Sequence, residues 1–251
     1  MEVTDAIIIA AGTVRDPELA RAANGRHKSF IPLNGRPAVS YVVENLKRCG
    51  HISRTVVVAG EECRQAVVDV DVFVDGSDGV NEAVLAGIDA VKESERCLLM
   101  TGDMPLASAQ AIEDFLDSAP DADVVYPIVE KSVVKAAFPE RLSSYLHLTE
   151  GAFTGSSCLL FRPQAASQRM DTLQKLLEAR DNPAGLVGVL GVGFAMKMMF
   201  GKLSVNDLET RLSEAFGLEC RAFVTSHPEL LVSIDSKEDL AIVEEALSDV
   251  I

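Results

Sequence analysis

Residues 6–15 have the sequence AIIIAAGTVR, an apolar run that ends in small residues. A short apolar run bounded by turn residues predicts a buried strand, which we place at residues 6–10. The small residues Ala10, Ala11 and Gly12 close this run and let backbone N–H groups approach a phosphate closely. The stretch therefore predicts a strand that leads directly into a candidate phosphate-binding loop.

The same pattern continues along the chain, where short apolar runs alternate with segments of helical periodicity. We expect further strands at residues 55–59, 97–101 and 123–129, and helices at 38–48, 81–92 and 108–118. This alternation is typical of a parallel sheet with right-handed crossovers and helices on both faces. The predicted fold class is α/β, with three layers in the order α/β/α.

The second half of the chain is less regular. We expect a strand at 157–161, a mainly helical insertion at 164–217, strands near 221–224 and 231–235, and a last helix, all within a single domain of residues 1–251. The apolar stretch 185–201 has only seventeen residues and contains Lys197, so it is too short for a good membrane span. A buried or partner-facing helix is expected there, and docking on a membrane or an acyl-bearing acceptor is the alternative.

The composition excludes several classes of protein. A formal charge of -15 and a pI near 4.7 disfavour nucleic acids and anionic membranes as partners. The five cysteines are far apart and form no C-x-x-C pair, so neither a disulfide framework nor a zinc site is indicated. The first residues are acidic where a signal peptide would be basic, so we expect a cytoplasmic protein. Self-association into a homo-oligomer stays open.

Charged residues follow three of these segments. Arg15 and Lys28 lie in the loop after the first strand, and they could neutralise phosphates there. Asp103 ends the strand of MTGDMPL (100–106), and Asp235 ends the apolar run of VSIDS (232–236). Because ligands of open parallel sheets bind at the carboxyl ends of the strands, both carboxylates would meet one crevice and could hold Mg²⁺.

Each residue also has a simpler interpretation. Gly12 could serve a tight turn beside two solvated cations, and Asp235 or Ser236 could only cap the last helix. The loop is not a P-loop, because His27 precedes Lys28 where that motif requires glycine. No catalytic triad and no histidine spacing typical of metal sites are found in the sequence.

Taken together, these motifs resemble the MobA-like NTP transferases, a nucleotidyltransferase family with the nucleotide-diphospho-sugar transferase fold, which is GT-A-like and Rossmann-type with a mostly parallel mixed sheet. The resemblance covers nearly the whole chain and implies roles for particular residues. Asp103 and Asp235 would bind Mg²⁺ or Mn²⁺, and Lys28, Arg15 and Asp103 would be the catalytic residues. The segment DGSDGVN (75–81) would approach the base and ribose with Asn81 as a contact, and its alternative is the start of a helix. The triphosphate would be held by Lys28 and by the loop residues Ala10, Ala11 and Gly12.

The implied reaction transfers an NMP group from an NTP to a small phosphorylated or hydroxyl acceptor and releases pyrophosphate. The sequence departs from the closest branch of the family, because Val14 lies near a missing second glycine and Ser143, Ser156 and Ser157 replace residues of two other segments. A catalytically inactive nucleotide-binding or regulatory relative is therefore an alternative. A glycosyltransferase of the same fold is another, although the segment Asp103-Met104-Pro105 lacks the second aspartate of the usual D-x-D motif.

Overall fold

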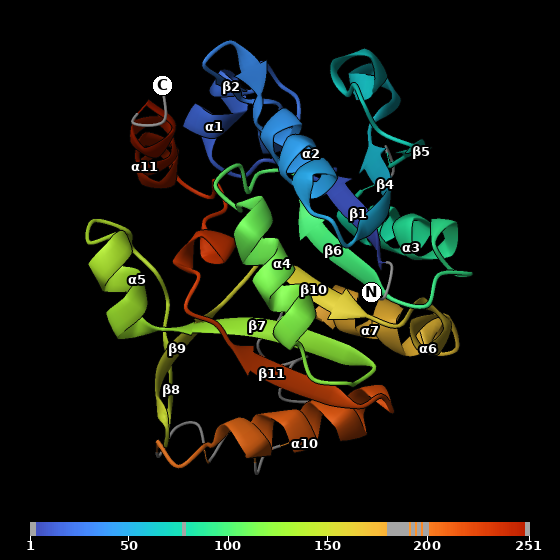
Figure 1. The fold of residues 1–251 in the computed structure, drawn as a ribbon, viewed down its shortest axis with the longest axis vertical. Helices are drawn as coiled ribbons and strands as arrows, with labels where there is room; N and C mark the ends of the chain where they lie inside the picture. Colours follow the sequence, from blue (N-terminus) through green and yellow to red (C-terminus); the bar gives the residue numbers. More distant parts are fainter. Residues whose placement is uncertain are drawn as a thin grey trace.

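Strand β1 (Thr4–Ala10), which contains the apolar run at 6–10, is buried along its whole length inside a large sheet (Figure 1). A computed structural model describes residues 4–76, 79–179, 191, 194, 197 and 201–248. Within those residues the sheet has nine strands in the order β5-β4-β1-β6-β10-β7-β9-β8, and β11 also pairs with β7. The other strands are β4 (Ile52–Ala59), β5 (Val72–Asp75), β6 (Cys97–Thr101), β7 (Val124–Glu130), β8 (Leu146–Leu148), β9 (Gly151–Gly155), β10 (Cys158–Phe161) and β11 (Cys220–Val224), and a separate small sheet pairs β2 (Pro32–Leu33) with β3 (Arg36–Pro37).

The large sheet is mixed. Strands β5, β4, β1 and β6 are parallel, so their carboxyl ends share one edge. Strand β10 is inserted between β6 and β7 and is antiparallel to both. Strand β9 is antiparallel to β7, and β8 pairs with β9 in a hairpin. The predicted α/β class is confirmed, and the expected strands at 55–59, 97–101, 123–129 and 157–161 overlap β4, β6, β7 and β10.

Helices cover both faces of the sheet, as the alternation predicted. Ala6 and Ile8 of β1 face a core shared with α2 and α4, whereas Ile7 and Ile9 face a core shared with α3, α6 and α7 (Figure 1). Burial of each such aliphatic side chain contributes roughly 1.5–3 kcal/mol, so the two cores fix the sheet between its helical layers. The helices are α1 (Pro17–Ala22), α2 (Ala38–Arg48), α3 (Val80–Ala90), α4 (Ala109–Ser118), α5 (Lys131–Ala137), α6 (Pro163–Ser167), α7 (Met170–Ala179), α10 (Val205–Phe216) and α11 (Lys237–Ser248), and the short 3-10 helices are η1 (Lys28–Phe30), η2 (Glu61–Ala66) and η3 (Pro228–Leu231).

The prediction of a strand at residues 231–235 is wrong. Helix η3 ends at Leu231, and the following residues are extended but belong to no strand. Their backbone bonds are local or isolated: Ser233 N–H donates to Leu231 O at 3.1 Å, and Ile234 N–H donates to Asp103 O at 3.1 Å. Val232 and Ile234 are buried, which explains an alternation that resembles a strand.

Within the range 164–217, which was predicted to be mainly helical, the described residues form α6, α7 and α10 with turns and loop residues between them. The apolar stretch 185–201 lies almost entirely outside the described residues. Of its four described positions, Phe194 packs against the cluster around Leu203, and Lys197 pairs with Asp207 at 2.7 Å. Among the helices described, none has the length and apolar character that a bilayer crossing would need.

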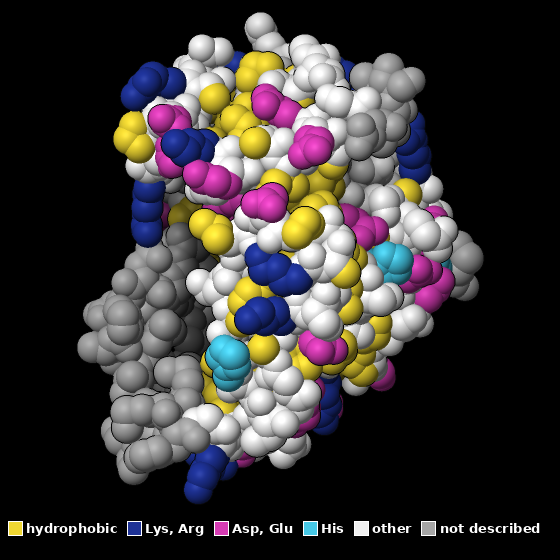
Figure 2. Space-filling view, turned by 90° about the vertical axis from the view of Figure 1, so that its left-hand side faces the viewer, with side chains coloured by type: hydrophobic (Ala, Val, Ile, Leu, Met, Phe, Trp, Pro, Cys, Tyr) yellow, Lys and Arg dark blue, Asp and Glu magenta, His cyan; other side chains and the backbone are white. Residues whose placement is uncertain are grey.

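The surface agrees with the acidic composition. On the face shown in Figure 2, the described Lys and Arg side chains stand singly or in small groups, with Asp and Glu side chains between them. That face therefore offers no continuous basic surface among its described residues for a nucleic-acid backbone.

Candidate functional site

The loop after β1 begins at the shared edge of the parallel strands. Ala10 and Ala11 are buried, and Gly12 has φ +116°, a conformation that residues with a side chain rarely adopt. A Cβ at Gly12 would lie 3.1 Å from Val80 Cβ, so the loop packs tightly against the start of α3. The absence of a side chain thus lets this loop bend between β1 and α3.

Asp103 lies at the same edge, directly after β6. Gly102 N–H donates to Ile9 O at 2.9 Å, which continues the pairing of β6 with β1 up to this residue. A Cβ at Gly102 would lie 2.9 Å from Ser29 Oγ, so glycine also allows the turn around Lys28 to approach. The Asp103 side chain is only 1% exposed, and its Oδ1 has no hydrogen-bond partner among the described residues.

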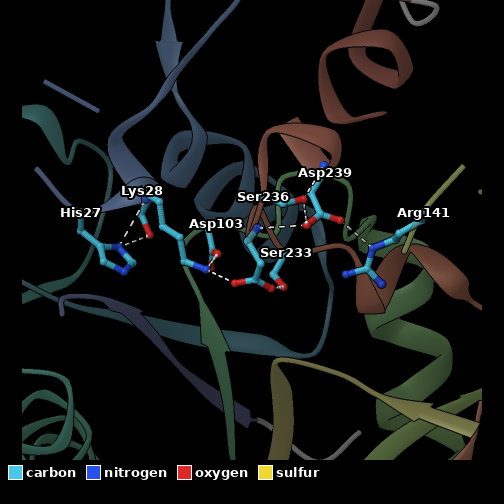
Figure 3. A network of polar contacts seen from close by, with 9 residues as sticks. His27, Lys28, Asp103, Arg141, Ser233, Ser236 and Asp239 are labelled. Carbon is cyan, nitrogen blue, oxygen red and sulfur yellow. Dashed lines mark hydrogen bonds and ion pairs between the residues drawn. The ribbon is translucent and has the colours of Figure 1, made fainter. Parts of the chain in front are cut away.

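Lys28 connects two carboxylates. Its Nζ lies 2.7 Å from Asp103 Oδ2 and also pairs with Asp235 Oδ1. Figure 3 shows the side chains of Lys28 and Asp103 pointing toward one another, although they come from different segments of the chain. Burial alone would lower the pKa of Lys28, but the charges of both aspartates outweigh it and raise this pKa. Burial would likewise raise the pKa of Asp235, but the charge of Lys28 lowers it. Lys28 and Asp235 are therefore both charged at neutral pH.

Asp235 is positioned by the start of the last helix. The hydroxyl of Ser233 donates to its carboxylate, and its backbone N–H donates to Asp239 Oδ2 at 3.3 Å. Asp239 is buried and also accepts from Arg141 Nε at 3.0 Å and from Ser236 Oγ at 2.8 Å. Figure 3 shows Arg141 turned toward Asp239, on the far side of the network from Lys28. Ser236 therefore caps the last helix, as one interpretation expected, and Asp239 holds the candidate metal ligand Asp235 in place.

Lys28, Asp103 and Asp235 line one cavity of about 590 Å³. Arg15, Asn81 and Thr101 lie in its wall together with Lys28, Asp103 and Asp235. Asn81 Oδ1 and Thr101 Oγ1 are buried without a hydrogen-bond partner among the described residues, as Asp103 Oδ1 is. Buried polar groups normally have partners, so three orphan oxygens on one cavity indicate a polar ligand.

The structure brings most of the predicted site residues together here. Ala11, Gly12 and Val14 line the cavity, whereas Ala10 lines an adjoining cavity of about 440 Å³. Residues 77 and 78 of the predicted base-binding segment lie outside the described residues. The lining residues that were not predicted as part of the site include His27 and Thr101. A signal for Thr101 exists, because it is the only polar residue of an apolar strand that ends immediately before Gly102-Asp103.

The serines that depart from the family pattern have structural contacts. Ser156 is buried, and its hydroxyl donates to Leu230 O and accepts from Cys158 N–H at 3.1 Å. Ser143 Oγ accepts from Arg141 Nη1 at 3.1 Å. Ser157 O accepts from Thr101 N–H at 3.2 Å through its backbone. These contacts hold the segments around the site, and none of the three residues lines the main cavity.

The donor set fits a particular kind of metal. Asp103 and Asp235 offer hard oxygen ligands, and Mg²⁺ takes one or two protein carboxylates when phosphate oxygens and water complete its shell. Among the described residues, no group of three or more His, Cys, Asp or Glu side chains could hold a metal by itself. The residues therefore suit a cation that arrives with a phosphate ligand.

Comparisons with known proteins show which family and fold the chain resembles. A family model described as the MobA-like NTP transferase domain matches residues 6–182. The structure is similar to that of a hypothetical transferase from Thermus thermophilus, with 32% identity, a TM-score of 0.84, and coverage of 95% of this chain and 99% of that one. It also resembles 4-diphosphocytidyl-2C-methyl-D-erythritol synthase from Anaerococcus prevotii, with 14% identity, a TM-score of 0.59, and coverage of 98% and 96%.

A curated relative covers less of the chain. The bifunctional protein GlmU of Burkholderia thailandensis is 33% identical over 122 residues, which span 46% of this chain and only 26% of that relative. The family model, in contrast, includes the loop after β1, Lys28, Asn81 and Asp103. The chain therefore belongs to the family of MobA-like NTP transferase domains.

Proposed function

We propose that this protein is a Mg²⁺-dependent nucleotidyltransferase that transfers an NMP group from an NTP to a small acceptor and releases pyrophosphate. The observation that carries the proposal is the cavity at the edge of the parallel strands, where Lys28, Asp103 and Asp235 meet beside three orphan buried oxygens. A nucleoside triphosphate with its metal supplies both the anion and the cation that these groups can bind.

Each group has a role in this proposal. Asp103 and Asp235 would hold Mg²⁺ or Mn²⁺, which would offset the charge that develops on the phosphates. Lys28 and Arg15 bind and orient the triphosphate, while Asn81 Oδ1 accepts a hydrogen bond from the nucleoside. Because Lys28 now pairs with both aspartates, its ammonium shifts from carboxylate to phosphate when the nucleotide binds.

Transfer is direct and needs no covalent intermediate on the protein. Burial raises the pKa of the Cys63 thiol, which lines the adjoining cavity, to about 11, so this thiol is protonated at neutral pH and is a weak nucleophile. The acceptor oxygen forms the new bond to the α-phosphorus, the bond to the bridging oxygen breaks, and pyrophosphate leaves with the electron pair. A phosphorylated acceptor suits this step, because its oxygen is already deprotonated.

The proposal also includes the cellular compartment and the partners of the enzyme. All five cysteines are unpaired and buried, which supports a reducing compartment such as the cytoplasm. The acceptor is a small molecule, and neither a nucleic acid nor a membrane is required as a partner.

The test is pyrophosphate release with each of the four NTPs and Mg²⁺, against a panel of sugar phosphates, polyol phosphates and pterin cofactors. We expect release with one or few combinations, and we expect Asp103→Asn to lower turnover roughly 100- to 1,000-fold, because a preorganised charge is lost from the transition state. The mutant should still fold, because asparagine has nearly the same shape as aspartate, although it loses the ion pair with Lys28 Nζ.

Asp69→Asn is the matched control, because this aspartate is exposed and lies away from the cavity. Folded Asp103→Asn protein with normal turnover would disprove the assigned site. A wild type that binds nucleotide but releases no pyrophosphate across the panel would favour the inactive, regulatory alternative.

A further inference from the structure

His27 lies at the border of two cavities. It lines the main cavity beside Lys28, and it also lines the adjoining cavity of about 440 Å³, whose wall includes Gly60 and Gly76. The two cavities share the loop residues around Gly12. A nucleotide that extended from one cavity into the other would therefore pass the imidazole ring, for which the reaction proposed above has no role.

The hydrogen bonds of His27 fix its tautomer. Ser29 N–H donates to His27 Nδ1 at 3.3 Å, and Ser29 Oγ lies 2.9 Å from the same atom. A backbone N–H can only donate, so Nδ1 must carry a lone pair, and the neutral ring carries its hydrogen on Nε2. Among the described residues, Nε2 has no hydrogen-bond partner, and Figure 3 shows the ring bonded on one side only.

The surroundings keep the ring neutral. Burial, with a smaller contribution from the charge of Lys28, lowers the pKa of His27 to about 4, although the charges of Asp103 and Asp235 oppose this shift. At neutral pH the side chain is therefore an uncharged donor, with one N–H group at the wall of the cavities.

We propose that His27 binds the nucleotide by donating a hydrogen bond from Nε2 to a phosphate oxygen. The inference rests on the proposed function, and the phosphate follows from the neighbours of the ring. Lys28 is the next residue, Arg15 lines the same cavity, and Gly12 leaves space for an anion to approach. A neutral donor adds a bond to the phosphate without competing with the metal for Asp103 and Asp235.

The rival interpretation is purely structural. His27 is the N-cap of η1, and its Nδ1 satisfies the Ser29 N–H at the start of that turn. Two substitutions separate the roles, because they preserve different halves of the ring. His27→Asn keeps an acceptor near the position of Nδ1 but has no atom in place of Nε2. His27→Gln carries an amide N–H that reaches the Nε2 position but offers no acceptor near Nδ1.

The experiment measures equilibrium binding by calorimetry, without acceptor, for each of the four NTPs with Mg²⁺ and for inorganic tripolyphosphate with Mg²⁺. We expect His27→Asn to weaken binding of both the preferred nucleotide and tripolyphosphate roughly tenfold or more, while its melting temperature stays near that of the wild type. His27→Gln should recover most of the affinity.

Other results would overturn the assignment. Wild-type affinity in His27→Asn together with weak binding in His27→Gln would reduce His27 to a cap. A loss confined to nucleotides, with tripolyphosphate unaffected, would move the contact from phosphate to the nucleoside. A wild type that binds none of the four NTPs would refute the proposed function itself, and this role of His27 with it.

Discussion

At the scale of single residues, the site depends on one ammonium group between two carboxylates. Asp103 is almost completely buried, and Asp235 lines the same cavity. Lys28 places its ammonium group between the two carboxylates. Lys28 is itself only 20% exposed, so each charge of the cluster depends on the others. Lys28 thus lies where a metal ion held by the two carboxylates would also lie.

This arrangement predicts a competition between Lys28 and the metal. Lys28→Met should lower the melting temperature in EDTA, because Asp103 loses its cation, and Mg²⁺ should raise it again more than it does in the wild type. Thermal denaturation over a series of Mg²⁺ concentrations measures both effects. Lys47→Met is the matched control, since Lys47 is exposed and its contact with Asp69 is 3.8 Å long. An equal response to Mg²⁺ in Lys28→Met and the wild type would contradict the idea.

Sequence patterns predicted some of these residues and not others, for a physical reason. Asp103 was predictable because a carboxylate immediately after a buried parallel strand must lie at the ligand-binding edge. Lys28 was a candidate from its place in the loop, but its pairing with Asp103 and Asp235 was not predicted, because nothing in a polar loop shows which groups a cation meets. His27 gave no signal, since a histidine beside a lysine is as compatible with solvent as with a buried cap.

At the scale of elements, Asp235 is positioned by the start of α11, whereas it was expected at the end of a strand. The alternation of Val232, Ser233 and Ile234 satisfies the two-residue period of a strand, because every second side chain is apolar and buried. The period does not reveal where backbone bonds go, and here a single bond to Asp103 O replaces a ladder. The predicted place of Asp235 beside Asp103 is nevertheless retained, because that bond joins the two segments.

Arg141 should be essential to this element. Arg141→Met would leave Asp239 buried without its cation, which should cost about 3 kcal/mol of unfolding free energy. The same change should weaken Mg²⁺-nucleotide binding, because Asp239 holds the backbone of Asp235. Urea denaturation and calorimetry measure the two quantities.

Arg48→Met is the comparison variant, because its pair with Glu44 is exposed and should contribute less than about 1 kcal/mol. An Arg141→Met protein as stable as Arg48→Met would show that the buried pair is not required. A destabilised protein with unchanged nucleotide affinity would separate the pair from the position of Asp235.

At the scale of the whole molecule, the sequence predicted the α/β layering but not every strand direction. The alternation of apolar runs and helices sufficed for β1, β4 and β6, which are parallel to one another. Nothing in the run SCLLF indicates that β10 is antiparallel, because both directions bury the same side chains. Strands β8 and β9 were missed, since each is short and only partly apolar.

The pH dependence of the stability of the whole molecule can be used to test whether His27 is buried and neutral. Its pKa is about 4 in the folded chain, against 6.5 for the unperturbed side chain. Between these values the unfolded chain binds a proton that the folded chain excludes, so this contribution to stability is present above pH 6.5 and is lost as the pH falls toward 4. The difference corresponds to at most about 3 kcal/mol.

The opposing effect is global, because a chain of formal charge -15 repels itself less as the pH approaches its pI near 4.7. That relief acts equally on wild type and His27→Asn, whereas only the wild type has the excluded proton. Lys28 has a raised pKa and Asp235 a lowered one, so both keep their charge throughout the window above about pH 4.5. Denaturant unfolding between pH 4.5 and 7.5 should therefore show stability falling more steeply on acidification in the wild type than in His27→Asn. Parallel curves for the two proteins would mean that the imidazole accepts its proton in the folded state, and that it is not buried against the cavity wall.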